Sequence, residues 1–211
     1  MYPNMPLPLD ATISSLAFSM GADFYGVADL GPARDFVFRQ GGERIARYPI
    51  VVAVGIQLSD DLVNLLADKD HEGAILHLHN GYEVTNQLLD QIAVRLAGVL
   101  QREGHHAFPV PASRRTNDEE IRAVFSHKIA AHLAGLGWIG KSCLLVTPDH
   151  GPRVRWVSVL TDAPLTPSGS PMTSRCGDCT ACVDICPQQG LHEANVRAGR
   201  APGGAVRCRG M

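Results

Sequence analysis

The sequence has little of what marks exported, membrane-spanning or nucleic-acid-binding proteins. Its first residues, MYPNMPLPLD, lack the basic and apolar regions of a secretory signal, and no apolar run is long enough to span a bilayer. Only 19% of the 211 residues are charged and the formal net charge is -2, so no basic excess indicates a nucleic-acid surface. No G-x-G-x-x-G or phosphate-loop pattern is present. We therefore expect a cytoplasmic protein without a membrane or nucleic-acid partner.

Cysteine is almost confined to the end of the chain. Of six cysteines, Cys143 comes first and the other five follow residue 170. Cysteines at metal-binding spacing without an export signal favour a reducing compartment, with an exported disulfide-containing protein as the alternative. Cys143 begins an apolar segment and is expected to be a small core residue.

Helical and strand patterns alternate through the first 165 residues. Apolar residues at helical spacing predict helices over 10–20, 82–103 and 119–134. β-branched and alternating runs predict strands over 23–30, 48–58, 105–113, 142–148 and 153–162. This order indicates an α/β or α+β domain.

A change of composition follows that domain. Residues 162–177 contain three prolines and several small polar residues, which is typical of a linker. We therefore divide the chain into a domain at 1–165 and an iron–sulfur segment at 166–211.

The segment RCGDCTACVDICP, residues 175–187, carries the strongest chemical signal. Its cysteines follow the spacing C-x2-C-x2-C-x3-C and Pro187 comes directly after, which is a bacterial-ferredoxin signature for a [4Fe–4S] cluster. Zinc sites usually pair two C-x2-C units across a longer loop, so the spacing favours a cluster over zinc. The candidate metal ligands are Cys176, Cys179, Cys182, Cys186 and Cys208.

The fourth ligand of the cluster stays open. Cys176, Cys179 and Cys182 supply three thiolates, and the fourth position could be filled by Cys208, Cys186, a substrate, a water or a second chain. In two-cluster proteins the cysteine before the proline ligates the other cluster, so we favour Cys208 over Cys186. Five cysteines from 176 to 208 cannot hold two complete all-cysteine cubes, and we predict one cluster per chain.

With the stretch AGLGWIGKSCLLVTPDHGPRVRWVSVLTDAPL ahead of this cysteine segment, the chain resembles the epoxyqueuosine reductases. These are cobalamin-dependent iron–sulfur enzymes related to reductive dehalogenases. The resemblance implies an α+β fold, with a nitroreductase-like α/β sandwich core and a C-terminal ferredoxin-type segment. It also implies an oxidoreductase in which a redox partner protein donates electrons and the cluster passes them to a bound corrinoid or a small substrate. The residues that would bind the corrinoid, cobalamin or a related one, are Gly135, Gly137, Trp138, Gly140 and Lys141.

The chain departs from the family at two places. The family has a later C-x2-C-x3-C run that would lie beyond Met211, so we expect either a natural short form with one rearranged cluster or an incomplete protein. The family's proton-donating acid corresponds to Ile121, while Asp118, Glu119 and Glu120 are out of register. One helical position turns a side chain by about 100°, so the tRNA-modifying reaction is not expected and the catalytic residues are unknown.

Two hypotheses follow. One is the reductase just described, and the alternative is a non-catalytic [4Fe–4S] electron carrier or docking partner. His77 and His79 alternate in ILHLHNGY, which would place both on one strand face, and we interpret them as polar surface positions.

Overall fold

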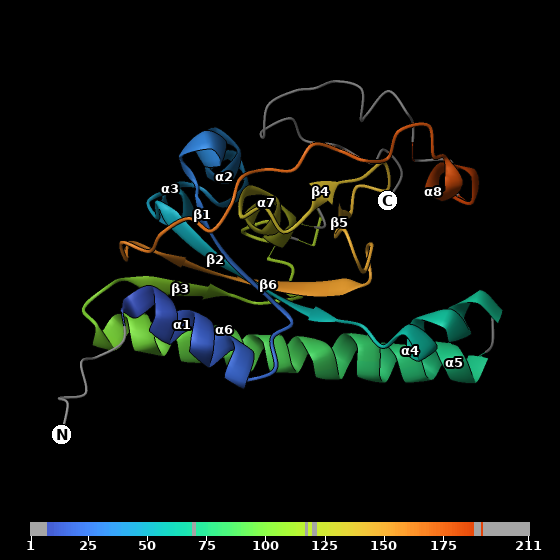
Figure 1. Ribbon diagram of the computed structural model, residues 1–211, viewed down its shortest axis with the longest axis horizontal. Helices are drawn as coiled ribbons and strands as arrows, with labels where there is room; N and C mark the ends of the chain where they lie inside the picture. The colour runs from blue at the N-terminus through green and yellow to red at the C-terminus, as the bar shows by residue number, and fades with distance from the viewer. Residues whose placement is uncertain (1–7, 69–70, 117, 120–121, 188–190, 192–211) are drawn as a thin grey trace.

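The structure is a computed structural model that describes residues 8–68, 71–116, 118–119, 122–187 and 191. Its centre is a four-stranded sheet in the order β1-β2-β6-β3, and every neighbouring pair is antiparallel (Figure 1). The strands are β1 (Phe24–Asp29), β2 (Ile50–Gln57), β6 (Val154–Thr161) and β3 (Ala107–Val110). Each lies within a predicted strand, and the mixed fold of helices and an antiparallel sheet agrees with the α+β prediction.

Helices cover both faces of this sheet (Figure 1). One face packs against α1 (Leu9–Ser19) and α6 (Thr85–Arg102), and the opposite face against α7 (His127–Leu133) with α2 (Arg34–Gly41) and α3 (Glu43–Ala46). The continuous apolar run 51–54, three valines and one alanine, is completely buried, because alternate residues enter the two cores.

A long helical stretch precedes and includes α6. It runs through α5 (His71–Leu76) and the π-helical η3 (His77–Val84), and the short α4 (Asp60–Asn64) and η2 (Leu65–Asp68) come before it. The strand expected to hold His77 and His79 is therefore wrong: both residues lie in η3, and His79 Nδ1 is 3.2 Å from Glu83 Oε2 one turn later. The stretch lacks a β-branched run, and its backbone continues directly into the strongly amphipathic α6.

The helix predicted over 119–134 is shorter than expected and begins at His127. Before it, the backbone N–H of Thr116 donates to the Arg122 carbonyl over 3.0 Å, and Ser126 has extended dihedral angles. Residues 122–126 are therefore not helical: Arg122 forms an isolated bridge, and Val124 and Phe125 form a bend. Ile121 and Glu120 lie outside the described residues.

The glycine-rich turn and the strand predicted over 142–148 form a small hairpin. Its strands are β4 (Trp138–Ile139) and β5 (Leu145–Val146), closed by the Gly140 N–H on the Leu144 carbonyl and the Cys143 N–H on the Gly140 carbonyl, each at 2.9 Å. Cys143 has a φ of 61° at this turn and is buried, which confirms its expected place in the interior. The remaining elements are η1 (Gly31–Ala33) and α8 (Ala181–Asp184). Among the helices of the described ranges, none is long and apolar enough to cross a membrane.

Candidate metal centre

The predicted linker lies along the domain. The Thr166 N–H donates to Asp10 Oδ1 over 2.8 Å, and the Val27 N–H donates to Ser168 Oγ over 2.9 Å. The Ser168 N–H in turn donates to the Val27 carbonyl over 3.0 Å. The cysteine segment therefore begins from a fixed point on β1.

Two glycines allow the linker to approach the AGLGW turn closely. Gly135 follows α7 with a φ of +77°, and a Cβ there would lie 2.8 Å from the Ser170 carbonyl oxygen. A Cβ on Gly169 would lie 2.7 Å from the Ala134 carbonyl oxygen. Real Cβ atoms do not approach that closely, so both backbones need glycine at this crossing.

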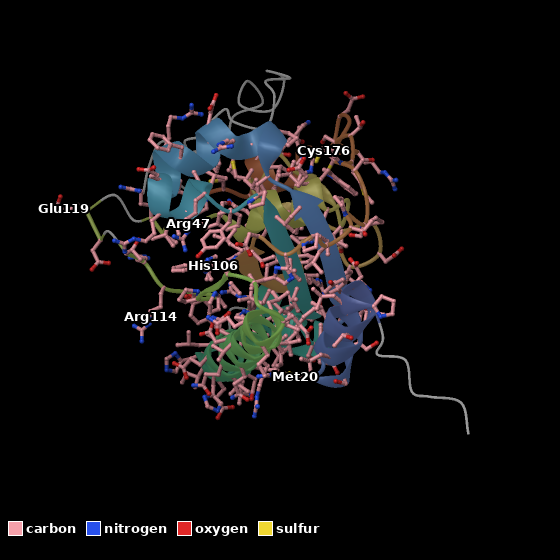
Figure 2. The ribbon with its side chains drawn as sticks, turned by 90° about the vertical axis from the view of Figure 1, so that its left-hand side faces the viewer. Met20, Arg47, His106, Arg114, Glu119 and Cys176 are labelled. Atoms are coloured by element: carbon pink, nitrogen blue, oxygen red, sulfur yellow. The ribbon has the colours of Figure 1, made fainter. Side chains whose placement is uncertain are left out.

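Beyond the crossing, the cysteine segment contacts the β4–β5 hairpin. The Cys176 sulfur would lie 3.5 Å from a Cβ on Gly140, and Lys141 Nζ donates to the Cys179 carbonyl over 2.9 Å. The Arg175 guanidinium carbon is 5.6 Å from the centroid of the Trp138 ring. Figure 2 shows Cys176 at the end of the molecule opposite Met20, above the sheet. Gly140 and Cys176, which are 36 positions apart in the sequence, thus lie together at one corner of the structure.

The Cys176 thiol lies among hydrogen-bond donors. Burial raises its pKa, but the Lys141 N–H, the Trp138 indole N–H, the Ser174 hydroxyl and the Lys141 charge together lower it below the ordinary value. The buried Trp138 Nε1 has no partner at good hydrogen-bonding geometry in the described part of the chain, so its contact with the sulfur is electrostatic. Such surroundings favour the thiolate, which is the metal-binding form of cysteine.

The other described cysteines of the motif follow Cys176 along the same segment. Cys179 is exposed and its N–H donates to the Cys176 carbonyl over 2.9 Å, Cys182 lies on α8, and Cys186 follows α8. Within the described ranges, no three His, Cys, Asp or Glu side chains gather as metal ligands. Cys208 lies outside the described residues. The structure therefore supports one corner of a thiolate site at Cys176 and leaves the full ligand set a prediction.

The residues at this corner fit an iron–sulfur cluster chemically. Thiolates are the ligands that such clusters require, and hydrogen bonds to sulfur tune their potentials. Trp138 offers a buried N–H without a good acceptor, and Gly140 leaves space against the Cys176 sulfur.

Two cavities in the described part of the chain lie elsewhere. One, of about 190 Å³, is lined by Asp29, Arg34 and Tyr48 among others, and the second, of about 200 Å³, by His127, Lys128 and Arg155 among others. Neither is lined by the cysteines or by residues 135–141. Both are smaller than the roughly 300–1,000 Å³ typical of small-molecule sites, and a corrinoid is larger still, so neither cavity fits a corrinoid. The corrinoid roles of Gly135, Gly137, Trp138, Gly140 and Lys141 stay predictions.

Two polar clusters were missed by reasoning from sequence. The His127 ring hydrogen-bonds Ser158 Oγ over 2.9 Å through Nδ1 and the Pro111 carbonyl over 3.0 Å through Nε2. Arg155 donates from Nε and Nη2 to Asn86 Oδ1 over 3.1 and 3.0 Å. The only signal in the sequence was an arginine in an otherwise buried strand.

Comparison with known proteins gives consistent relatives, although no family model matches the chain. An epoxyqueuosine reductase of Bacillus anthracis is 39% identical over 66 residues, which is 31% of this chain and 17% of that protein. One of Xanthomonas campestris is 44% identical over 61 residues, covering 29% of this chain and 17% of that protein. The matched segment is thus about a sixth of these relatives' length.

Solved structures extend the likeness in fold. A catabolic reductive dehalogenase in complex with 3-bromo-4-hydroxybenzoic acid matches 86% of this chain and 25% of its own, with a TM-score of 0.67 and 21% identity. An epoxyqueuosine reductase bound to a modified tRNA stem loop matches 87% of this chain and 52% of its own, with a TM-score of 0.57 and 18% identity. The resemblance to the epoxyqueuosine reductase family is therefore confirmed, by a sequence segment of about 30% of the chain and by the fold of most of it.

Proposed function

We propose that the protein is an iron–sulfur oxidoreductase that passes single electrons from one [4Fe–4S] cluster to a small substrate bound by the α+β domain. A reductase is consistent with relatives that are epoxyqueuosine reductases and reductive dehalogenases. The observation that carries the proposal is the docking of the cysteine segment onto the β4–β5 hairpin, with the Cys176 sulfur against Gly140.

The chain's own residues have three tasks in this proposal. Cys176, Cys179 and Cys182 hold the cluster, which supplies one-electron chemistry when bound. Trp138 and the Lys141 backbone N–H orient toward the Cys176 sulfur and stabilise its negative charge. The Lys141 side chain holds the loop by its bond to the Cys179 carbonyl.

The nature of the acceptor is a prediction from the relatives. One solved relative is described as carrying out B12-dependent dehalogenation, with 22% identity and a TM-score of 0.66. Because neither cavity fits a corrinoid, no step of the proposal is routed through one. A redox partner protein is proposed as the electron donor.

Metal analysis tests the cluster. Anaerobically purified protein is expected to carry about four irons and four sulfides per chain, with the broad absorbance of a cluster. Cys182→Ser is expected to lose most of this iron, while Cys143→Ser, on the hairpin but outside the motif, keeps it. Iron retained in Cys182→Ser would refute the assignment, and near eight irons per chain would refute a single cluster.

The same measurement on Cys186→Ser and Cys208→Ser identifies the fourth ligand. We expect iron loss in Cys208→Ser, and loss only in Cys186→Ser would reverse that choice.

A second candidate function is a [4Fe–4S] electron carrier or docking partner without catalysis. It is favoured by the position of both cavities, which lie away from the cysteine segment. Gel filtration of reconstituted protein with cobalamin separates the two. Corrinoid absorbance that elutes with the protein supports the corrinoid reductase, and a cluster without any bound corrinoid or reducible substrate supports the carrier.

A further inference from the structure

The second cavity lies where the sheet edge is left open. Strand β3 pairs with residues 158–161 of β6 and then ends at Val110, so the first half of β6 pairs with no strand of the described residues on that side. The space beside it is enclosed by the start of α7, by β5 and by the turn before β6. The full lining is Ala112, His127, Lys128, Leu144, Leu145, Pro152, Val154, Arg155 and Trp156.

Two permanent cations reach this cavity, and none of the described residues that line it is acidic. Lys128 Nζ donates to the Cys143 carbonyl over 2.8 Å, which uses one of its three donors. Arg155 is partly buried, and its partners are neutral: the Asn86 amide oxygen and the Tyr82 ring, whose centroid is 4.6 Å from the guanidinium carbon. In the described ranges, no carboxylate forms an ion pair with either side chain.

An unpaired guanidinium in such a position is costly. Removing a charge from water without a counter-charge is unfavourable, and buried charges are normally paired. Burial lowers the pKa of Arg155. The interactions that act against this lowering are with Tyr82, and no carboxylate contributes to them. His127, which also lines the cavity, adds no further positive charge, because it is neutral: its Nε2–H donates to the Pro111 carbonyl and its Nδ1 accepts from the Ser158 hydroxyl.

The remaining walls are apolar. Leu144, Leu145, Pro152, Val154 and Trp156 supply hydrocarbon and indole surface beside the two cations. A volume of about 200 Å³ admits a ligand smaller than a typical drug-sized molecule. The site therefore combines charge for an anionic group with surface for a small apolar body.

We propose that this cavity binds a small organic carboxylate, with the anionic group between Lys128 and Arg155 and the apolar body against Leu144, Val154 and Trp156. The proposal does not depend on the iron–sulfur function. If the protein binds no cluster, carboxylate binding is still expected, and if carboxylate binding fails, the cluster assignment is unaffected.

Calorimetric titration of the full chain with benzoate tests the site, with benzyl alcohol as the uncharged probe of similar shape. We expect benzoate to bind at least tenfold more tightly than benzyl alcohol, because hydrogen bonds to charged groups are the stronger ones. Trp156 lines the cavity, so its fluorescence is expected to change on binding. Equal affinities for benzoate and benzyl alcohol would overturn the anionic part of the proposal.

Variants locate the binding. Lys128→Gln is expected to weaken benzoate binding by about tenfold, and because Lys128 is exposed, this variant is expected to fold normally. Arg155→Gln is expected to weaken it at least as much. Arg34→Gln, which lines the other cavity, is the matched control and is expected to leave the affinity unchanged. Unchanged binding in Lys128→Gln, or an equal loss in Arg34→Gln, would refute the site. Inorganic phosphate that displaced benzoate at equal concentration would refute the apolar part of the assignment.

Discussion

The docking of the cysteine segment can be tested with a matched pair of glycines. Gly135 and Gly104 each end a helix in a Schellman motif. After α7, the Gly135 N–H donates to the His132 carbonyl and the Leu136 N–H to the Ala131 carbonyl. After α6, the Gly104 N–H donates to the Gln101 carbonyl and the His105 N–H to the Leu100 carbonyl. Their φ angles are +77° and +89°. They differ in surroundings, because a Cβ at Gly104 would have nothing within 4 Å, whereas at Gly135 it would lie 2.8 Å from the Ser170 carbonyl oxygen and 3.0 Å from its nitrogen.

The expected magnitudes separate the two variants. Alanine in a left-handed conformation costs about 1–2 kcal/mol, and this applies to both Gly104→Ala and Gly135→Ala. Only in Gly135→Ala must the Ser170 backbone retreat by several tenths of an ångström, and such overpacking costs about 1–3 kcal/mol more. For a domain of this size each additional kcal/mol lowers Tm by about 2–4 °C.

Thermal unfolding and limited proteolysis together measure the effect. We expect Gly135→Ala to melt several degrees below Gly104→Ala, and trypsin to cleave it faster after Arg175, because the linker is displaced from the domain. If the linker moves away freely, the melting difference shrinks and the proteolysis difference grows. Equal melting temperatures together with equal cleavage rates would show that the crossing does not hold the segment.

Two further predictions concern buried side chains. Burial and the nearby Arg155 charge lower the pKa of His127 to about 4, although its hydrogen bond to the Pro111 carbonyl and the Asp90 charge act in the opposite direction. Between about pH 6.5 and 4, the His127 ring is therefore protonated in the unfolded state and neutral in the folded state. The free energy of unfolding should therefore fall by about 1.4 kcal/mol per pH unit from pH 6.5 to 4, and the same slope in His127→Gln would contradict this. Trp138→Phe should lower the reduction potential of the reconstituted cluster by about 20–60 mV, because the indole N–H dipole beside the Cys176 sulfur favours the more negative reduced state. Trp156→Phe is the control in an EPR-monitored titration, and equal potentials in the two variants would exclude the role of Trp138.

Local patterns predicted most of the sheet and its two largest helices. The run 51–54 is continuously apolar and rich in valine, and the apolar residues of α6 repeat at helical spacing, so each pattern identifies its element without knowledge of its partners. The start of α7 could not be predicted in this way, because His127 is held by Pro111 and Ser158 from distant segments. The same is true of η3, since a π-helical turn has no distinct sequence period.

The candidate site was predicted in its ligand type but not in its placement. The spacing of Cys176, Cys179 and Cys182 indicates cluster ligation, because all three belong to one short segment and their spacing can be read directly from the sequence. The neighbours of Cys176 are Gly140 and Lys141, which are distant in sequence and meet it where the linker crosses the AGLGW turn at Gly135 and Gly169. The cavity that Lys128 and Arg155 line exists because β3 ends at Val110, opposite Ser158 of β6. The sequence of neither strand shows where this pairing ends.

The β4–β5 hairpin has a consequence for how its two sides communicate. Its turn contacts the Cys176 sulfur through Gly140, while the Cys143 carbonyl in the same turn accepts a hydrogen bond from Lys128 at the cavity. An anion that draws the Lys128 ammonium away removes a partner from this turn. Any coupling of this kind is reciprocal: the factor by which the anion changes the affinity of the cysteine segment for its metal equals the factor by which the metal changes the affinity for the anion.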